Sequence, residues 1–344
     1  MSSDSGREFG GHGPVLSNGP QAAADQARRA DPHEDPVHDP GPSRHRSTRT
    51  ADERPDMTST VPGGTLTLAD DLTLSRMGYG AMQLAGPGVF GPPKDRTQAL
   101  AVLREAVDLG ITHIDTSDFY GPFVVNELIK EALHPYPDDL RIVTKVGARR
   151  DETGGWIPAH APAELTSQVH ENLQHLGLDA LDVVNLRIPS YDGPSEDSIA
   201  EQFAALADLR DKGLIRHLGL SGASDAQLTE AQAIAPVVTV QNLYNLANRA
   251  DDALVDRCAA ENIAFAPFFP LGGFNPLQSQ TLTDVADELD AAPQQVALAW
   301  LLQRSAGIVL IPGTSSLAHL RENIAAADLA LPDDAIARLN AVGR

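Results

Sequence analysis

The chain has 344 residues, which is enough for one large domain or two ordinary ones. Its formal charge of -21 at pH 7 argues against nucleic acid and anionic membrane surfaces as partners. A single cysteine, Cys258, excludes an intrachain disulfide and a cysteine metal cluster and is consistent with a reducing, cytoplasmic setting. No apolar run approaches the roughly 18 residues of a membrane span.

The first 60 residues differ from the rest of the chain. They are rich in Gly, Pro, Ser, Asp, Arg and His and contain almost no large apolar side chains. Such a segment cannot bury enough surface to offset its ordering entropy, so residues 1–60 are predicted to be a disordered tail. Met57 resembles an ordinary protein start, which suggests that the tail is an extension or reflects a misplaced start codon.

After the tail, a short β-hairpin is expected over residues 66–74, with a polar turn at residues 69–71. One strand–helix pattern then repeats to the end of the chain. The expected strands are short and apolar, which is typical of strands buried on both faces, and cover residues 77–81, 111–114, 141–146, 181–186, 215–220, 237–241, 263–268 and 308–311. The expected helices cover residues 95–109, 123–133, 162–176, 198–212, 225–234, 251–261, 282–289, 294–304, 317–326 and 333–340.

Eight strand–helix units over about 260 residues predict a (β/α)8 TIM barrel, formed by residues 61–344. In such a barrel the active site lies at the carboxyl ends of the strands. Asp115, Tyr120 and Lys145 all fall at such ends.

These three residues are a plausible proton-transfer set. An ammonium near a phenol favours the phenolate, so Lys145 is expected to lower the pKa of Tyr120, and Asp115 is expected to keep the lysine charged and in place. The alternative is a structural ion pair between Asp115 and Lys145, with Tyr120 as a half-buried loop aromatic. Spacing alone does not separate the two interpretations, and the barrel favours the functional one.

A competing motif lies at residues 86–91, where Gly86, Gly88 and Gly91 match the G-x-G-x-x-G dinucleotide fingerprint. That fingerprint needs a helix start directly against the phosphate. Here Pro92 and Pro93 follow the third glycine, so no helix can begin before about Lys94. We therefore interpret this segment as a shaped loop over the barrel mouth, in which Phe90 either walls the substrate site or packs within the loop.

Several motifs, in order, resemble the aldo/keto reductase family from about Leu66 to the end of the chain. They are Gly78–Gly80, Ile114–Gly121, Thr144–Gly147, Gly219–Ser221, Val240–Asn245, Pro270–Gly272, Ile311–Ser316 and Glu322–Asn323. More narrowly, residues 76–93, 183–187 and 267–273 resemble the bacterial pyridoxal reductase branch of that family.

The resemblance implies an NADPH-dependent reductase that converts a small-molecule aldehyde to an alcohol, and pyridoxal to pyridoxine in particular, as part of vitamin B6 metabolism. It implies that Tyr120 protonates the carbonyl oxygen while Lys145 and Asp115 tune it. It assigns cofactor contacts to Ser221 and Gln241 (carboxamide), Phe268 (nicotinamide ring), Leu271 and Gly272 (pyrophosphate), Thr314, Ser315 and Ser316 (2'-phosphate and its ribose), and His319, Glu322 and Asn323 (adenosine). The Gly-Thr-Ser-Ser stretch is equally suited to capping a helix, and a helix start is itself an anion site.

Three positions depart from the family pattern. Arg187 stands where the family usually has a catalytic histidine, and an arginine has no acceptor with which to relay a proton. Our hypothesis is that Arg187 binds the phenolate oxygen of pyridoxal; the alternative is an ion pair with a loop acid such as Asp192. Gly222 stands where asparagine often follows the serine, and Gly313 replaces a basic residue, which leaves phosphate binding to hydroxyls, backbone N–H groups and a cation such as Arg321.

Other interpretations stay open at this stage. Arg149 and Arg150 could attract a substrate phosphate or be ordinary surface arginines, and Trp156 could cover a flat substrate or pack on the barrel. The chain could reduce a broad range of small aldehydes and ketones, or be a non-catalytic NADPH-binding barrel. No metal site is expected, because the strand ends lack clustered His and Asp. The sequence carries no prediction of oligomeric state.

Overall fold

The structure is a computed structural model that describes residues 61–188, 197–273 and 277–343. The predicted tail, residues 1–60, lies outside these ranges. The first element is the expected hairpin, in which β1 (Thr65–Ala69) pairs antiparallel with β2 (Leu72–Ser75) across the polar turn. Leu72 and Leu74 are buried on one face of this hairpin.

The central sheet contains seven parallel strands in the order β11-β10-β9-β8-β5-β4-β3. Their bounds are Tyr79–Gly80 (β3), His113–Asp115 (β4), Arg141–Val146 (β5), Leu181–Arg187 (β8), Ile215–Ser221 (β9), Val237–Gln241 (β10) and Ala264–Phe265 (β11). Nearly all of their residues are buried, as expected for strands covered on both faces.

The predicted eighth strand, residues 308–311, closes this sheet into a barrel. It forms two isolated β-bridges rather than a continuous strand: Ile308 pairs parallel with Phe265, and Leu310 pairs parallel with Met77. Backbone hydrogen bonds support both sides, from Val309 N–H to Phe265 O at 3.0 Å and from Leu310 N–H to Arg76 O at 2.7 Å. The predicted eight-stranded barrel is therefore confirmed, with short strands at its seam.

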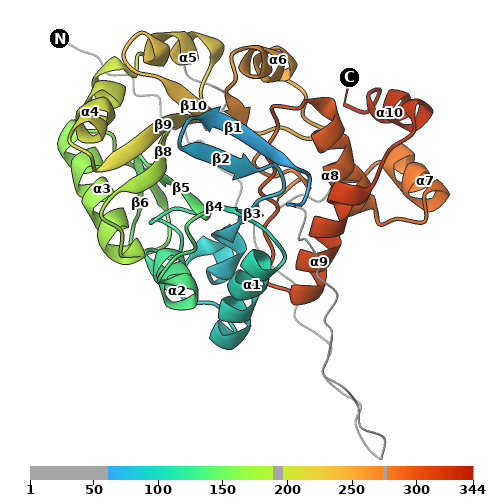
Figure 1. Ribbon diagram of the computed structural model, residues 1–344, viewed down its shortest axis with the longest axis horizontal. Helices are drawn as coiled ribbons and strands as arrows, with labels where there is room; N and C mark the ends of the chain where they lie inside the picture. The colour runs from blue at the N-terminus through green and yellow to red at the C-terminus, as the bar shows by residue number, and fades with distance from the viewer. Residues whose placement is uncertain (1–60, 189–196, 274–276, 344) are drawn as a thin grey trace, which may run out of the picture. The chain divides into compact units, whose positions relative to one another are not determined.

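Helices cover the outside of the barrel (Figure 1). Their bounds are Arg96–Asp108 (α1), Val124–Leu133 (α2), Pro162–Leu176 (α3), Ala200–Asp211 (α4), Asp225–Gln232 (α5), Asp252–Ala260 (α6), Gln280–Glu288 (α7), Pro293–Arg304 (α8), Leu317–Ala325 (α9) and Asp333–Leu339 (α10). The proline-rich loop before α1 contains the short 3-10 helices Ala81–Leu84 and Pro87–Val89, so α1 begins at Arg96, capped by Asp95. This agrees with our rejection of a dinucleotide fingerprint at residues 86–91.

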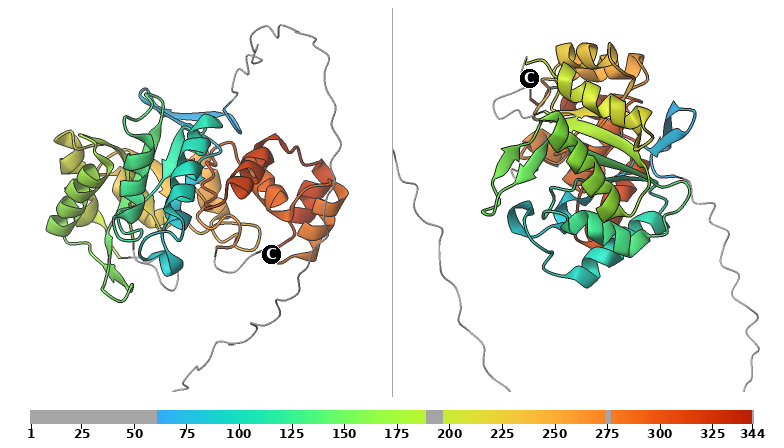
Figure 2. Two further views of the ribbon diagram at one scale, coloured as in Figure 1. Left: turned by 90° about the horizontal axis from the view of Figure 1, so that it is seen from below. Right: turned by 90° about the vertical axis from the view of Figure 1, so that its left-hand side faces the viewer.

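Hairpin β1–β2 covers the end of the barrel where the strands begin. Leu72 and Leu74 pack with Val143, Val183 and Val238 from the barrel interior. In the left-hand view of Figure 2 the blue hairpin lies at one end of the barrel and a green hairpin projects from the other. Because one end is closed by apolar packing, the opposite end, where the strands finish, is left for a site.

The green hairpin is an element that the sequence analysis missed. Strands β6 (Ala148–Arg150) and β7 (Trp156–Pro158) pair antiparallel just after β5. Each is only three residues long, and no alternating apolar pattern marks them. Trp156 and Ile157 are exposed, so these strands do not show the apolar pattern by which buried strands are predicted.

Within the described ranges, no helix has the length and apolar character needed to cross a membrane. In the same residues, no three His, Cys, Asp or Glu side chains are placed to hold a metal ion together.

Candidate active site

The polar residues singled out in the sequence lie at the ends of five neighbouring strands. Asp115, Arg187, Ser221 and Gln241 are the last residues of β4, β8, β9 and β10, and Lys145 is the last but one of β5. Ser221 pairs in register with Arg187 on one side and with Gln241 on the other. The barrel therefore gathers these side chains at one mouth.

Lys145 and Asp115 form a buried ion pair at this mouth. Lys145 Nζ donates to Asp115 Oδ1 at 2.7 Å and to the backbone oxygen of Thr116 at 2.9 Å. The second carboxylate oxygen of Asp115 accepts from Gln241 Nε2 at 2.8 Å. Both carboxylate oxygens are thus satisfied, which is what a buried charge requires.

Tyr120 lies in the loop between β4 and α2 and is only 7% exposed. Its ring stands 5.3 Å from Lys145 Nζ, measured to the ring centroid. The phenol, the ammonium and the carboxylate are therefore in one contiguous cluster, as the sequence predicted.

Lys145 acts on the pKa of Tyr120 in the predicted direction, but it does not set the net pKa. Burial is the largest influence and raises the pKa of Tyr120, and although Lys145 acts to lower it, the net pKa stays above the ordinary value. For Lys145, burial acts to lower the pKa, but Asp115 and Tyr120 more than offset it, so the net pKa is raised. The cluster therefore holds a charged lysine beside a protonated, neutral phenol, which is the form that can donate a proton.

Arg187 projects into the same mouth from the end of β8. Its guanidinium carbon lies 5.5 Å from the ring centroid of Trp156, and Arg150 stacks on the same indole at 4.1 Å. Phe119 meets Trp156 and Tyr120 edge to face, both at 5.3 Å between centroids. Trp156 is thus tied to the catalytic loop and to Arg187. The alternative partner named for Arg187, Asp192, lies outside the described residues.

Ser221 and Gln241 each hold a buried oxygen without a hydrogen-bond partner in the described structure: Ser221 Oγ and Gln241 Oε1. A buried polar atom that lacks a partner carries a desolvation cost. A hydroxyl can donate and the Gln241 oxygen can accept, so the two together suit a group that offers both a carbonyl oxygen and an N–H. An amide is such a group.

Gly222 departs from the family pattern for a local structural reason. Its φ of +77° lies in the left-handed region, and a Cβ there would come within 2.9 Å of the Ile188 oxygen. The side chain of Asn242 fills the neighbouring space instead: its oxygen accepts from the N–H groups of Gly222 and Ala223, each at 3.0 Å. Asn242 is a positioning residue that sequence reasoning did not single out, although it lies inside a quoted motif.

The remaining predicted cofactor residues fall into two groups along the chain. Phe268, Leu271 and Gly272 follow β11 and are half-buried; Phe268 pairs with Leu243 through a backbone bridge. The second group surrounds the start of α9, where Ser316 is the N-cap and Thr314 Oγ1 accepts from Ser316 N–H at 3.0 Å. In this group Thr314 and Asn323 are buried, Ser316 is half-buried, and Ser315, His319 and Glu322 are exposed.

The two arginines after β5 are already occupied by other contacts. Arg149 forms a bidentate pair with Glu171, with nitrogen–oxygen distances of 2.9 and 3.0 Å. Arg150 donates to the backbone oxygens of Gly88 and Val89, both at 2.9 Å, and to that of Gly154. These contacts favour the structural interpretation of both arginines over capture of a substrate phosphate.

The comparisons with known proteins agree with this geometry. Residues 76–344 match the model of the aldo/keto reductase family. The chain is 60% identical over 274 residues to pyridoxine 4-dehydrogenase of Escherichia coli (strain K12), covering 79% of this chain and 96% of that protein.

Solved structures show the same fold. A thermostable aldo-keto reductase in complex with the inhibitor epalrestat has a TM-score of 0.69 and 27% identity, covering 80% of this chain and 98% of that one. An aldo/keto reductase from Klebsiella pneumoniae in complex with NADP and acetate has a TM-score of 0.66 and 24% identity, covering 80% and 94% of the two chains. The chain described here is a member of the aldo/keto reductase family.

Proposed function

We propose that this protein reduces an aldehyde to an alcohol with NADPH and that its preferred substrate is pyridoxal, which it converts to pyridoxine. The observation that carries the proposal is the buried cluster of Tyr120, Lys145 and Asp115 at the carboxyl ends of the strands. Family membership and the 60% identity to a pyridoxine 4-dehydrogenase support the reaction and the substrate.

The residues at the mouth fit a nicotinamide cofactor. Ser221 Oγ and Gln241 Oε1 lack hydrogen-bond partners in the described structure. The Ser221 hydroxyl could donate to the carbonyl oxygen of the nicotinamide carboxamide, and Gln241 Oε1 could accept from its N–H. Bound NADPH would supply the hydride. Gln241 links this subsite to the proton donor, because its Nε2 holds Asp115 while its oxygen is left for the carboxamide. Phe268, Leu271 and Gly272 would line the ring and pyrophosphate.

The start of α9 would bind the 2'-phosphate end of the cofactor. The first N–H groups of a helix and its dipole favour an anion, and Thr314, Ser315 and Ser316 add hydroxyls. Arg321 is paired with Glu105 at 2.5 Å, which weakens it as the missing cation. Lys94 lines the same surface cavity as Ser315 and forms no hydrogen bond or ion pair in the described structure. It is therefore better placed than Arg321 to supply the positive charge that the family's basic residue provides and that Gly313 lacks. His319, Glu322 and Asn323 would flank the adenosine.

Tyr120 would donate the proton to the carbonyl oxygen as the carbonyl carbon is reduced. Lys145 stabilises the phenolate that this leaves, and Asp115 neutralises the lysine between turnovers. Arg187 cannot share the proton transfer, because a guanidinium has no acceptor. Its role would be to attract negative charge on the substrate.

Pyridoxal suits the surroundings of Arg187. The substrate is a flat ring with an oxygen next to its aldehyde, and Arg187 over Trp156 offers both a cation and an aromatic face. The engagement of Arg149 with Glu171 and of Arg150 with backbone carbonyls disfavours a phosphorylated substrate. A place in vitamin B6 metabolism follows from the substrate. A cytoplasmic location is a further inference, supported by the single buried cysteine.

The test measures NADPH oxidation with pyridoxal, pyridoxal phosphate and a simple aromatic aldehyde side by side, with wild type, Tyr120→Phe and Arg187→Ala. We expect pyridoxal to give the highest kcat/KM. Tyr120→Phe should lose about 100-fold or more in kcat, the usual contribution of a positioned acid, and still bind NADPH.

Arg187→Ala is expected to raise the KM for pyridoxal more than for the simple aldehyde. Unchanged pyridoxal turnover in that variant would remove Arg187 from substrate binding. Equal, slow rates for all three aldehydes would instead favour a broad-specificity reductase. NADPH binding without any oxidation would favour a non-catalytic barrel.

A further inference from the structure

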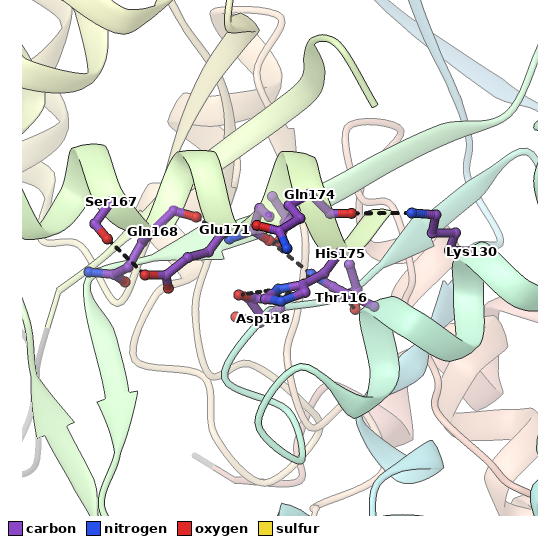
Figure 3. Close-up of polar contacts among 12 residues, drawn as sticks. Thr116, Asp118, Lys130, Ser167, Gln168, Glu171, Gln174 and His175 are labelled. Atoms are coloured by element: carbon purple, nitrogen blue, oxygen red, sulfur yellow. Dashed lines mark hydrogen bonds and ion pairs between the residues drawn. The ribbon is translucent and has the colours of Figure 1, made fainter. Parts of the chain in front are cut away.

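A buried acid and a histidine lie beside the catalytic loop and have no role in the steps above. Asp118 is two residues before Tyr120 and is 6% exposed. The Nδ1 atom of His175, on α3, lies 2.9 and 3.1 Å from the two carboxylate oxygens of Asp118 (Figure 3). Asn126 Nδ2 also donates to Asp118 Oδ1 at 3.1 Å, and the ring of Phe123 packs on His175 with centroids 4.5 Å apart.

The pair lies between two hollows in the protein. Asp118 lines a pocket of about 70 Å³ whose wall also includes Lys145. His175 lines a wider surface depression, together with Lys130 and Glu131. Because one water molecule needs roughly 10–15 Å³ of space open to its centre, this inner pocket has room for a few. Asp118 and His175 therefore connect the solvent-facing depression to a water-sized space that reaches the catalytic lysine.

The charges around Asp118 suit reversible protonation. Glu171, on the same helix as His175, acts on Asp118 but is held by Arg149 of β6, and Lys145 of β5 lines the same pocket. Burial is the largest influence and raises the pKa of Asp118 to about 6, while His175 acts to lower it. Such a carboxyl can take up and release a proton near neutral pH.

The reaction needs a supply of protons at Tyr120. Each reduction consumes one proton, which Tyr120 passes to the substrate oxygen and must then recover. The histidine that could share this duty is replaced by Arg187, which cannot accept a proton. Tyr120 is 7% exposed, so its contact with bulk solvent is small and neighbouring groups offer a second route for its proton.

We propose that Asp118 and His175 form a relay pair that carries protons from solvent through the inner pocket to Lys145 and Tyr120. As the substrate O–H bond forms, the Tyr120 O–H bond breaks, and Lys145 then gives a proton to the phenolate. Water in the pocket reprotonates Lys145 and is itself reprotonated by Asp118, and His175 restores Asp118 from solvent. One proton leaves solvent per turnover and no group is oxidised or reduced along the path. The inference rests on the proposed reductase activity but not on the identity of the aldehyde.

The test compares Asp118→Asn and His175→Gln with His170→Gln, a matched control in which an exposed histidine of the same helix is replaced. Each is assayed in dilute buffer, with and without added imidazole, in water and in deuterium oxide. We expect the two relay variants to lose about tenfold in kcat, with a larger solvent isotope effect, while imidazole restores much of the rate by carrying the proton itself. The dissociation constant of NADPH and the kcat of His170→Gln should stay at wild-type values.

A second readout needs neither cofactor nor turnover. It is carbon-13 NMR of aspartate-labelled, cofactor-free protein, with the Asp118 signal assigned through Asp118→Asn. The Asp118 carboxyl should titrate near pH 6 in the wild type. It should titrate at higher pH in His175→Gln, because the histidine lowers this pKa in the wild type.

Two results would overturn the relay. One is a loss of kcat that imidazole does not restore and that leaves the solvent isotope effect unchanged, as expected if the pair only fastens the loop to α3. The other is an Asp118 titration that does not respond to His175→Gln. If the wild type reduces any aldehyde, the proposed function stands and these variants alone decide the relay; if it reduces none, both proposals fall.

Discussion

The side chain of Lys145 is 4% exposed and that of its partner Asp115 is 5% exposed, so this ion pair lies out of reach of solvent screening. Two buried charges are tolerated because each is hydrogen-bonded: the ammonium to Asp115 and Thr116, the carboxylate to Lys145 and Gln241. The consequence is that neither charge can be removed alone without leaving the other unpaired.

Lys145→Met is therefore expected to destabilise the protein by about 3–5 kcal/mol, because Asp115 is left charged and buried without its cation. The double variant Asp115→Asn, Lys145→Met should be more stable than Lys145→Met, since it removes both charges. Urea denaturation of the three proteins measures this. If Lys145→Met were as stable as the wild type, burial of Asp115 would not depend on its ion pair with the lysine. Both variants should lack reductase activity.

At the residue scale, Asp115, Tyr120 and Lys145 could be identified from the sequence because their positions relative to the strand ends can be read along the chain. It did not identify Asp118 and His175, which are 57 positions apart and meet because the loop between β4 and α2 packs against α3. It gave the correct direction for the effect of Lys145 on the pKa of Tyr120 but not the net rise, because burial, the largest influence on that pKa, depends on the surrounding fold.

At the element scale, one arginine joins two loops over the barrel mouth. Arg150 of β6 donates to Gly88 and Val89 of the loop before α1 and to Gly154 within its own hairpin. Val89 has a φ of 58°, an unfavourable conformation for a β-branched residue, so this loop needs external support. The same guanidinium stacks on Trp156, which in turn contacts Arg187.

Arg150→Met is expected to lower the free energy of unfolding by about 1–3 kcal/mol and to increase amide exchange over residues 86–91, because three backbone oxygens lose a charged donor. The KM for the aldehyde should rise as Trp156 loosens. Hydrogen–deuterium exchange and urea denaturation test this, with Arg149→Met as control: its half-exposed ion pair with Glu171 is expected to contribute less than about 1 kcal/mol. Equal effects of the two substitutions would contradict the assignment.

Sequence patterns predict most helices and strands of this fold and miss a few. Apolar strands and amphipathic helices recur along the chain, and the predicted order of units is confirmed. The hairpin β6–β7 was missed because its stability comes from contacts with a distant loop and with Arg187, not from a local pattern. The eighth strand was predicted over residues 308–311 and forms only bridges, because its neighbours at the seam are themselves two residues long.

At the scale of the whole molecule, the chain divides at Asp56 and Met57, and the barrel begins with its N-terminal hairpin. We propose that residues 61–344 are the complete catalytic domain, supported by the family match over residues 76–344. The hairpin belongs to this domain because Leu72 and Leu74 seal the barrel end where the strands begin.

A protein that starts at Met57 is therefore expected to keep the melting temperature of the full chain within a few degrees and its kcat within about twofold, because it keeps every core residue of the described barrel. By contrast, Leu74→Ala in either protein should cost about 2–5 kcal/mol through the cavity it leaves at the barrel end. Thermal denaturation and the NADPH assay measure both. A large loss on removal of residues 2–56 would show that the tail contributes to the barrel.

The sequence by itself determined the order of strands and helices, the end of the barrel that carries the site, and the identity of its acid, amine and carboxylate. These are properties of local patterns and of positions along single strands. The tertiary structure decided which atoms lack partners, which arginines are already engaged, why glycine suits position 222, and how Asp118 and His175 meet beside the pocket that Lys145 lines. Those properties arise where segments distant in the chain exclude water together, and burial of that kind is not encoded in any one segment.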